Sequence, residues 1–341
     1  MNIPRVHLSR PAIVLPDEAV DNDAVLTRVR ESFRGSAAEW EPIEQGIRYI
    51  FDRCNTRVRY LEPDPTLSPG EFASRAASAC LWKNGVEANE IDLLVYGGIA
   101  REAFEPATAA EVAGRLGAKP LHAMDVTCAC AGLVEALHVV AGYFALHDDL
   151  KTAVVCAGEL MRDRVTYDIQ SVEDVAVRAA GLTLGNAAAA FLVTREPLPG
   201  GSARLVDIRH KTLSEHYDLC TAPVDGHFIS RSKELFALAV HVPPEIRDMI
   251  TSAGWSAADV DHYIFHQPSE AILKRVFGEL EARPEACVLT HSLFGNTAST
   301  SWAVALDHRL KHGNVQGGDK LVIASAASGF TIVGAAAVWD A

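Results

Sequence analysis

The stretch "DVTCACAG", residues 125–132, joins two segments with different hydrophobic patterns. Residues 121–126 read as a buried strand, and apolar residues across 133–141 repeat at helical spacing. A small-residue turn between a strand and a helix can hold a side chain at a helix N-terminus, where unpaired backbone N–H groups favour a thiolate. We therefore expect a strand–turn–helix unit in which one of two cysteines is chemically active.

Of these two cysteines, Cys130 is the stronger candidate for a nucleophile. It directly precedes Ala131 and Gly132, so we expect it at the first helical position, whereas Cys128 belongs to the strand end. Glycine allows close approach of backbone or substrate. A structural zinc site would need a second cysteine pair at matching spacing, and the sequence has none, so we predict no metal site.

The pattern around the two cysteines is repeated later in the chain. "NEIDLLVYGG" (89–98) and "ADVDHYIFHQ" (258–267) each combine an acidic turn, an aspartate and an apolar strand. "DVTCACAGLVEAL" (125–137) and "SLFGNTASTSWAVAL" (292–306) each follow with a small-residue turn and a helical pattern. Alternating strands and helices predict an α/β fold with parallel strands, and the repeat predicts two pseudo-symmetric halves.

A turn rich in proline and glycine, residues 196–202, separates the two repeats. We therefore divide the chain into an N-terminal half, residues 1–198, and a C-terminal half, residues 199–341. The first half contains Cys130, and the second contains His266 and Asn296. All three follow predicted strands at equivalent places, and ligands in such sheets bind beyond the carboxyl ends of strands. The sequence therefore predicts that the three side chains converge on one cleft.

Two chemistries are compatible with a cysteine, a histidine and an asparagine. In a papain-like hydrolase the histidine activates the cysteine and the asparagine orients the histidine. In a condensing enzyme the histidine and the asparagine both donate hydrogen bonds to an enolate formed when a malonyl-type thioester loses carbon dioxide. The duplication has no role in the first chemistry, and the apolar neighbours Phe265 and Phe294 favour the second.

The composition describes a soluble globular protein. The chain has 341 residues, of which 49% are hydrophobic and 22% are charged, with a net charge of −13. This charge argues against nucleic acid or an anionic membrane as a partner. No apolar run is long enough to span a membrane, and prolines interrupt the N-terminal stretch, so we expect a cytoplasmic protein without a signal peptide. The seven cysteines suit a reducing compartment.

Four short motifs resemble those of one family. They are "ACAG" (129–132), "FHQPSEAIL" (265–273), "FGNTAST" (294–300) and "ASGF" (327–330). In this order they are similar to motifs of the thiolase superfamily, specifically of the β-ketoacyl-ACP synthase III-like condensing enzymes. The resemblance implies a thiolase fold, with duplicated βαβαβαββ halves in an αβαβα arrangement, and a homodimer.

The resemblance also implies roles for individual residues. Cys130 would be the nucleophile, and His266 and Asn296 would be the other catalytic residues. The backbone amides of Gly329 and Cys130 would form the oxyanion hole. The segment "AREAFEPATAAEV" is similar to the head-to-head, olefin-forming branch, in which the matching glutamate, here Glu105, serves the partner subunit's site as a base.

The segment "CNTRVRYLEPD" (54–64) departs from the family's usual entrance motif but keeps Arg57 and Arg59 near the expected pantetheine entrance. With "HQPS" at 266–269, these departures indicate a specialised member of a fatty-acid or polyketide-type pathway. They leave acyl chain length, and the choice between CoA and acyl carrier protein (ACP), open.

We expect an acyltransferase without a tightly bound cofactor, whose substrates and partners are acyl-CoA or acyl-ACP thioesters of phosphopantetheine. Cys130 would take the acyl group, and a decarboxylative or head-to-head Claisen condensation would give a β-ketoacyl product. The alternatives are acyl transfer to a hydroxyl, amine or carrier thiol without condensation, a Cys-His-Asn thioester hydrolase, and a non-catalytic partner subunit.

Overall fold

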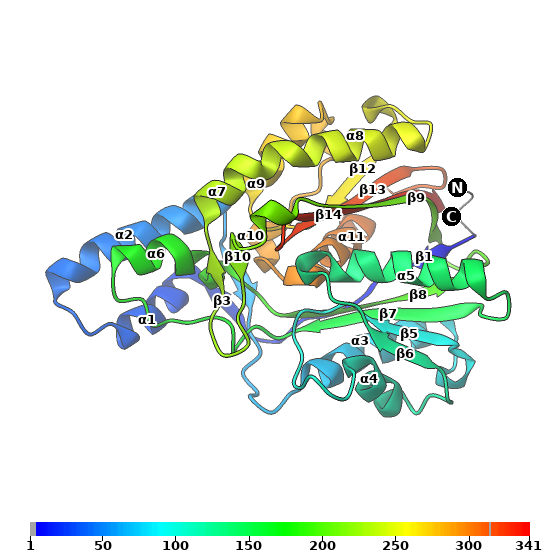
Figure 1. Cartoon of the computed structure of the whole chain (residues 1–341), viewed down its shortest axis with the longest axis horizontal. Coiled ribbons are helices and arrows are strands. Elements are labelled where there is room, and N and C mark those ends of the chain that lie inside the picture. Colours follow the sequence, from blue (N-terminus) through cyan, green and yellow to red (C-terminus); the bar gives the residue numbers. More distant parts are fainter. Residues whose placement is uncertain (1–4, 314) are drawn as a thin grey trace.

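A computed structural model describes residues 5–313 and 315–341 of the chain. One ten-stranded sheet runs through the molecule and is bent into two stacked layers (Figure 1). In spatial order its strands are β12 (His262–Phe265), β13 (Lys320–Ala327), β14 (Thr331–Asp340), β9 (Ser202–Thr212), β1 (His7–Ser9), β8 (Ala187–Thr194), β7 (Thr152–Glu159), β5 (Leu93–Tyr96) and β6 (His122–Asp125), with β2 (Ala12–Val14) also paired to β8. The short strand β1 lies at the bend, because it pairs antiparallel with both β8 and β9.

Helices cover both layers and fill the space between them. The helices between the layers are α5 (Gly132–Leu146) and α11 (Ser301–His312), those outside the β12–β9 layer are α8 (Val242–Ser252) and α9 (Glu270–Glu279), and those outside the β8–β6 layer are α3 (Pro69–Asn84) and α4 (Thr108–Leu116) (Figure 1). The result is five layers in the order αβαβα. This confirms the thiolase fold that the motifs imply.

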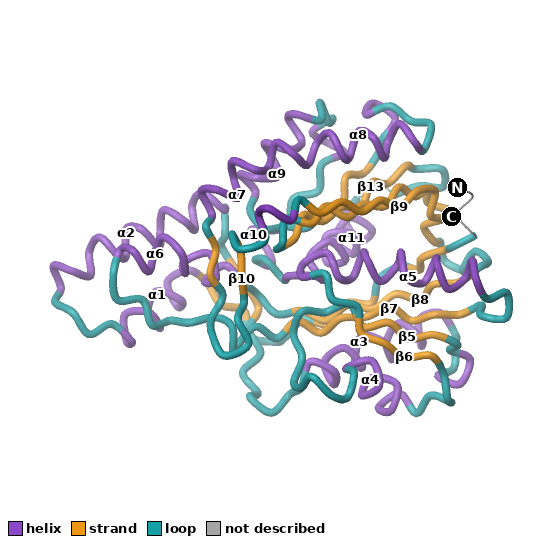
Figure 2. The backbone as a smooth tube through the Cα atoms, viewed as in Figure 1, coloured by secondary structure: helices purple, strands orange, loops and turns teal. Residues whose placement is uncertain are grey.

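A helical lobe extends from one end of the layers, at the left of Figure 2. It contains α1 (Asn22–Ser32), α2 (Ala37–Cys54) and α6 (Val172–Arg178), beside a small sheet of β3 (Ala19–Asp21) and β4 (Val58–Tyr60). Between the lobe and the layers lie α7 (Ser232–Leu238), α10 (His291–Phe294) and a hairpin of β10 (Cys220–Thr221) and β11 (Ile229–Ser230).

The duplication seen in the sequence recurs in the hydrogen bonds. Asp92 lies just before β5, and its carboxylate accepts from the Thr152 amide at 3.0 Å, at the start of β7. Asp261 lies just before β12, and its carboxylate accepts from the Lys320 amide at 2.9 Å, at the start of β13. In each repeat the aspartate therefore holds the next parallel strand in register. The division between residues 198 and 199 stays a prediction.

The space between the layers is the main hydrophobic core. Leu133, Leu137 and Val140 of α5 are fully buried there, and Trp302 of α11 stacks on Phe191 with ring centroids 4.9 Å apart. Within the described residues, only the segment Ala129–Leu146 is helical, long and apolar enough to cross a membrane by length and composition. Its place between two sheet layers accounts for this apolar character.

The strand before the two cysteines differs from the prediction. β6 covers only His122–Asp125, His122 is exposed and the other three residues are half-buried, whereas we expected a buried strand over residues 121–126. The reason is its place at the end of the sheet, because β6 pairs with β5 on one side only. Strand pairing therefore buries one edge of β6.

Candidate active site

A cavity of about 680 Å³ lies where the strands of both halves end. Cys130, His266 and Asn296 all line it. The rest of the lining is mostly apolar and includes Ile50, Ile99, Met161, Leu184, Leu235, Phe236, Ile272 and Phe330. The structure therefore brings together the three side chains that the repeat placed at equivalent strand ends.

Cys130 lies in a short 3₁₀ turn, Ala129–Ala131, and α5 begins two residues later at Gly132. The prediction that Cys130 occupies the first position of the helix is therefore wrong, because the chain tightens into this turn before α5 starts. The turn is anchored to the other half of the molecule, since the Ser325 hydroxyl of β13 donates to the Cys130 carbonyl at 2.9 Å.

The surroundings of Cys130 favour the thiol over the thiolate. Burial raises the pKa of Cys130 well above its ordinary value, and the neighbouring Cys220 and Glu159 raise it further. This differs from our expectation that the helix N-terminus favours a thiolate. Attack by Cys130 therefore requires removal of its proton as the reaction proceeds.

His266 follows β12 and is buried against the start of α11. Its Nδ1 lies 2.5 Å from the Ser301 hydroxyl, and that hydroxyl oxygen accepts from the Gln267 amide at 3.2 Å. The Ser301 proton is thus free to point at Nδ1, which favours the tautomer with N–H at Nε2. Burial, assisted by His291, lowers the pKa of His266 to about 3, so the ring is neutral near pH 7 and can donate without carrying charge.

Asn296 is held by both its backbone and its side chain. Its amide donates to the Thr183 carbonyl at 2.9 Å, and its Oδ1 accepts from the Ala298 amide at 2.9 Å. Because a backbone N–H must face the oxygen, the side-chain amide is oriented with Nδ2 as its remaining polar atom. Asn296 therefore offers the cavity a donor. Gly295, at φ 67° and ψ −161°, supplies the backbone conformation that allows this turn.

Three non-glycine residues with positive φ surround these side chains. Ala129 (φ 45°) precedes Cys130, Ala298 (φ 51°) follows Asn296 by two residues, and Phe330 (φ 45°) follows Gly329 (φ 79°) in the β13–β14 turn. Left-handed backbone at non-glycine residues is uncommon and concentrates at functional sites. Gly329 thus lies in a turn whose neighbours, Ser328 and Phe330, line the cavity. Its predicted part in an oxyanion hole stays a prediction.

Other residues singled out in the sequence lie away from the cavity. Glu105 is exposed on the loop before α4 and is not part of the lining. Arg59 is fully buried with its guanidinium 4.9 Å from the Phe51 ring, and Arg57 is exposed. Neither arginine lines the cavity, so the expectation that they mark the entrance is wrong.

Other basic residues line the cavity instead. The exposed lining side chains Tyr49, Arg53 and Lys233 mark an opening between α2 and α7. The sequence carried a weak signal for them, because Tyr49 and Arg53 are one helical turn apart at the end of a long amphipathic helix. Ser301, which orients His266, had no recognisable signal, because a serine at a helix start usually acts as a cap.

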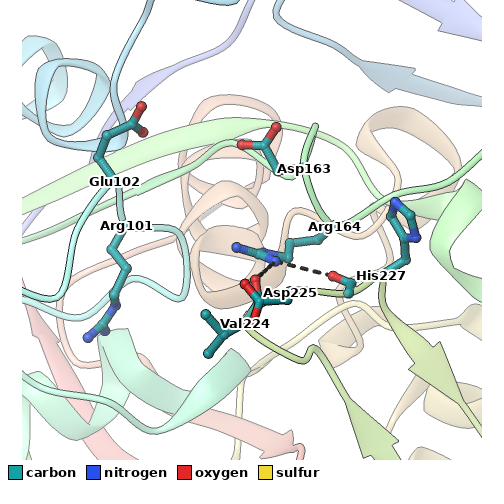
Figure 3. Close-up of a pocket in the computed structure, with 8 residues that line it drawn as sticks. Arg101, Glu102, Asp163, Arg164, Val224, Asp225 and His227 are labelled. Atoms are coloured by element: carbon teal, nitrogen blue, oxygen red, sulfur yellow. Dashed lines mark hydrogen bonds between the residues drawn. The ribbon is translucent and has the colours of Figure 1, made fainter.

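A second, polar depression adjoins the cavity and shares Arg101 and Arg164 with it (Figure 3). Its other lining residues include Glu102, Asp163 and Asp225. Figure 3 shows Arg164 pointing into the loop that connects β10 and β11. Its Nη1 donates to three carbonyl oxygens of that loop, those of residues 223, 224 and 226, at 3.0, 2.7 and 3.2 Å. Arg164 therefore secures the hairpin that forms one wall of the cavity.

The turn that carries Cys130 depends on a contact between two glycines. A Cβ built on Gly132 would lie 2.2 Å from the Gly97 carbonyl oxygen, which is backbone and has no flexible end to move. We expect Gly132→Ala to lower the free energy of unfolding by about 1–3 kcal/mol, as overpacking of a core does, measured by urea denaturation.

Gly142→Ala in the same helix is the matched control, because a Cβ there meets nothing within 4 Å. Alanine in an open helical position should stabilise by up to about 1 kcal/mol. If the two variants change stability alike, the contact between Gly132 and Gly97 does not constrain the turn.

The fold and the cavity define a class of protein, the thiolase-fold acyltransferases that use a cysteine. Two family models match the chain: 3-oxoacyl-[acyl-carrier-protein (ACP)] synthase III over residues 124–212, and the C-terminal model of the same synthase over residues 250–339. Together they cover more than half of the chain. The chain belongs to the β-ketoacyl-ACP synthase III family of the thiolase superfamily, and it is a synthase III-like acyltransferase.

Characterised relatives support this assignment along most of the chain. β-Ketoacyl-ACP synthase III 3 of Streptomyces coelicolor is 29% identical over 309 residues, which cover 86% of this chain and 89% of that protein. The synthase III of Rhodospirillum centenum is 28% identical over 306 residues, which cover 87% and 92%.

Solved structures show the same fold. FabH of Pseudomonas aeruginosa PAO1 superposes with a TM-score of 0.84 at 24% identity, covering 99% of each chain. OleA of Xanthomonas campestris, solved with bound lauric acid and lauroyl-CoA, superposes with a TM-score of 0.86 at 20% identity, covering 99% of this chain and 100% of that one.

Proposed function

We propose that this protein forms a carbon–carbon bond between two acyl thioesters through an acyl-Cys130 intermediate. In the first step the Cys130 sulfur attacks the carbonyl carbon of an acyl-CoA or acyl-ACP, a new C–S bond forms, and the carrier leaves as a thiol with the proton from Cys130. The amides of Cys130 and Gly329 would hold the oxyanion of this step.

In the second step a malonyl-type thioester loses carbon dioxide, and its enolate attacks the acyl carbon on Cys130. The products are a β-ketoacyl thioester and free Cys130, which takes up a proton. The His266 Nε2–H and the Asn296 Nδ2–H would both donate to the enolate oxygen. The observation that carries this proposal is that a neutral His266 and an Asn296 turned to present its Nδ2 line one cavity with Cys130.

The cavity also fits the proposed substrates. Its apolar lining suits an acyl chain, and Arg53 and Lys233 at the opening suit the phosphates of CoA or of an ACP phosphopantetheine arm. The relatives named above are ACP synthases, and the OleA structure holds lauroyl-CoA, which supports this class of substrate. Acyl transfer without condensation would need His266 as a base, and its lowered pKa disfavours that.

Incubation with a panel of acyl-CoAs, followed by malonyl-CoA or malonyl-ACP, tests this proposal. We expect intact-protein mass spectrometry to show one acyl group per chain, and product analysis to show carbon dioxide and a β-ketoacyl thioester. Release of a free acid would indicate a hydrolase. Transfer to an alcohol, amine or carrier thiol without carbon dioxide would indicate a transferase, and either result would contradict condensation.

The exposed end of the sheet supports a homodimer. β6 has a free edge in the described structure, and Phe104 beside it in the loop before α4 has 77% of its surface exposed. An open strand edge is a template for pairing with a second chain. We propose that two copies pair here, which would carry Glu105 towards the partner subunit, and sedimentation velocity at micromolar concentration tests this.

A further inference from the structure

Glu159, the last residue of β7, is a fully buried carboxylate that the proposed mechanism does not use. It does not line the cavity. A buried charge is costly unless hydrogen bonds replace the water that it has lost. The partners of this carboxylate therefore indicate what it holds in place.

Those partners come from two segments on either side of Cys130. Its Oε1 accepts from the Ile99 amide at 2.9 Å, and its Oε2 accepts from the Ala100 amide at 3.1 Å. The hydroxyl and the backbone N–H of Ser299 also donate to the carboxylate. One carboxylate thus joins the loop after β5 to the 3₁₀ turn Ala298–Thr300.

Both segments form part of the active-site wall. Ile99 and Ala298 line the cavity, and the Ala298 amide is the donor that orients the Asn296 side chain. Ser299, which binds Glu159, is the next residue along the chain. A shift of this turn would therefore move the Asn296 amide relative to Cys130.

We infer that Glu159 is a positioning residue for carbon–carbon bond formation: its carboxylate joins the loop at Ile99 and Ala100 to the turn after Asn296, and so fixes the Asn296 amide beside Cys130. This inference rests on the enolate-binding function proposed above for Asn296. Glu159 acts through Asn296 and touches no substrate.

The ionised form of Glu159 fits this arrangement best. A carboxylate accepts from all of these donors, whereas a protonated acid, or a glutamine, places a hydrogen where a donor already points. Burial raises the pKa of Glu159, and the bonds from Ser299, Ile99 and Ala100 oppose that rise. The acceptor is therefore lost at a higher pH than for an exposed glutamate.

The test compares Glu159→Gln with the unmodified protein in two separate measurements, acyl loading of Cys130 and condensation of the loaded enzyme. We expect loading to change little, because Glu159 has no contact with the proposed oxyanion amides. We expect condensation to slow by roughly 10–100-fold, the cost of a small displacement of a reacting group. The condensation rate of the unmodified protein should also fall at acid pH along a limb that Glu159→Gln lacks.

Asp125→Asn is the matched control. Asp125 also ends a strand, β6, and its carboxylate accepts from two backbone amides, those of Thr108 at 3.0 Å and Ala109 at 2.8 Å, but it binds α4 rather than the turn after Asn296. It should lower thermal stability without changing the ratio of condensation to loading. Ser299→Ala, which removes one bond to Glu159, provides a milder variant should Glu159→Gln fold poorly, and it should change the ratio in the same direction.

The outcomes separate this inference from the proposed function. Equal losses of loading and condensation in Glu159→Gln or Ser299→Ala would show only structural damage and overturn the inference. Loss of condensation in Asn296→Ala with normal condensation in Glu159→Gln would overturn it too, while leaving the function intact. Full condensation in Asn296→Ala would overturn the proposed function, and this inference with it.

Discussion

Cys130→Ala is expected to abolish covalent loading of an acyl group, so that intact-protein mass spectrometry shows no mass shift with any acyl-CoA. Cys130 is the proposed site of the new C–S bond, and alanine has no nucleophile to replace its sulfur. This is the largest effect we predict, since the covalent intermediate is lost rather than slowed.

Cys128→Ala is the matched control and should load normally. Cys128 precedes the 3₁₀ turn and is not part of the cavity lining, although it is two residues from Cys130. Cys54 and Cys220 do line the cavity, so peptide mapping must locate any acyl group. Acylation of Cys130→Ala at any of these three cysteines would mean that the nucleophile has been assigned to the wrong residue.

Asn296→Ala is expected to keep acyl loading and to lose condensation by about 10²–10³-fold, the usual effect of removing one oxyanion donor. Loading depends on Cys130 and backbone amides, whereas the enolate would depend on the Asn296 Nδ2–H. Rates of carbon dioxide release and of β-ketoacyl product formation measure the second step, and the mass shift measures the first.

Asn296→Asp separates the lost donor from damage to the turn. An aspartate keeps an oxygen that can accept from the Ala298 amide, so the turn is preserved, but it offers no donor and adds a negative charge near the enolate. We therefore expect condensation to stay low in this variant. Recovery of condensation with aspartate would show that Asn296 acts only by shaping the turn.

Much of the fold could be predicted because repeated local patterns reflect repeated units. The aspartate and apolar strand at 89–98 and 258–267 became β5 and β12, each followed by a parallel neighbour, since the hydrophobic pattern alone specifies buried strands. The position of β6 at the end of the sheet was not predictable, because exposure of an edge depends on strand order rather than on the strand's own residues.

The cavity shows the same limit. Cys130, His266 and Asn296 could be placed together because each follows a strand at an equivalent point of the repeat. The burial of Arg59 over Phe51 and the contact of Glu159 with Ser299 join residues far apart in the chain. No local pattern records such contacts, so a buried arginine looked like an entrance residue.

The position of β1 at the bend of the sheet has a consequence for how the chain folds. His7 pairs with Thr194 of β8 and with Arg204 of β9, so both neighbours of this strand are made long after it during synthesis. Contacts between residues so distant in sequence slow folding, because a long loop must close before they form. Residues 199–341 made alone would lack β1 and leave the edge of β9 open to other chains, which favours aggregation. Despite their similar patterns, the two halves are therefore expected to fold as one unit and not as separable domains.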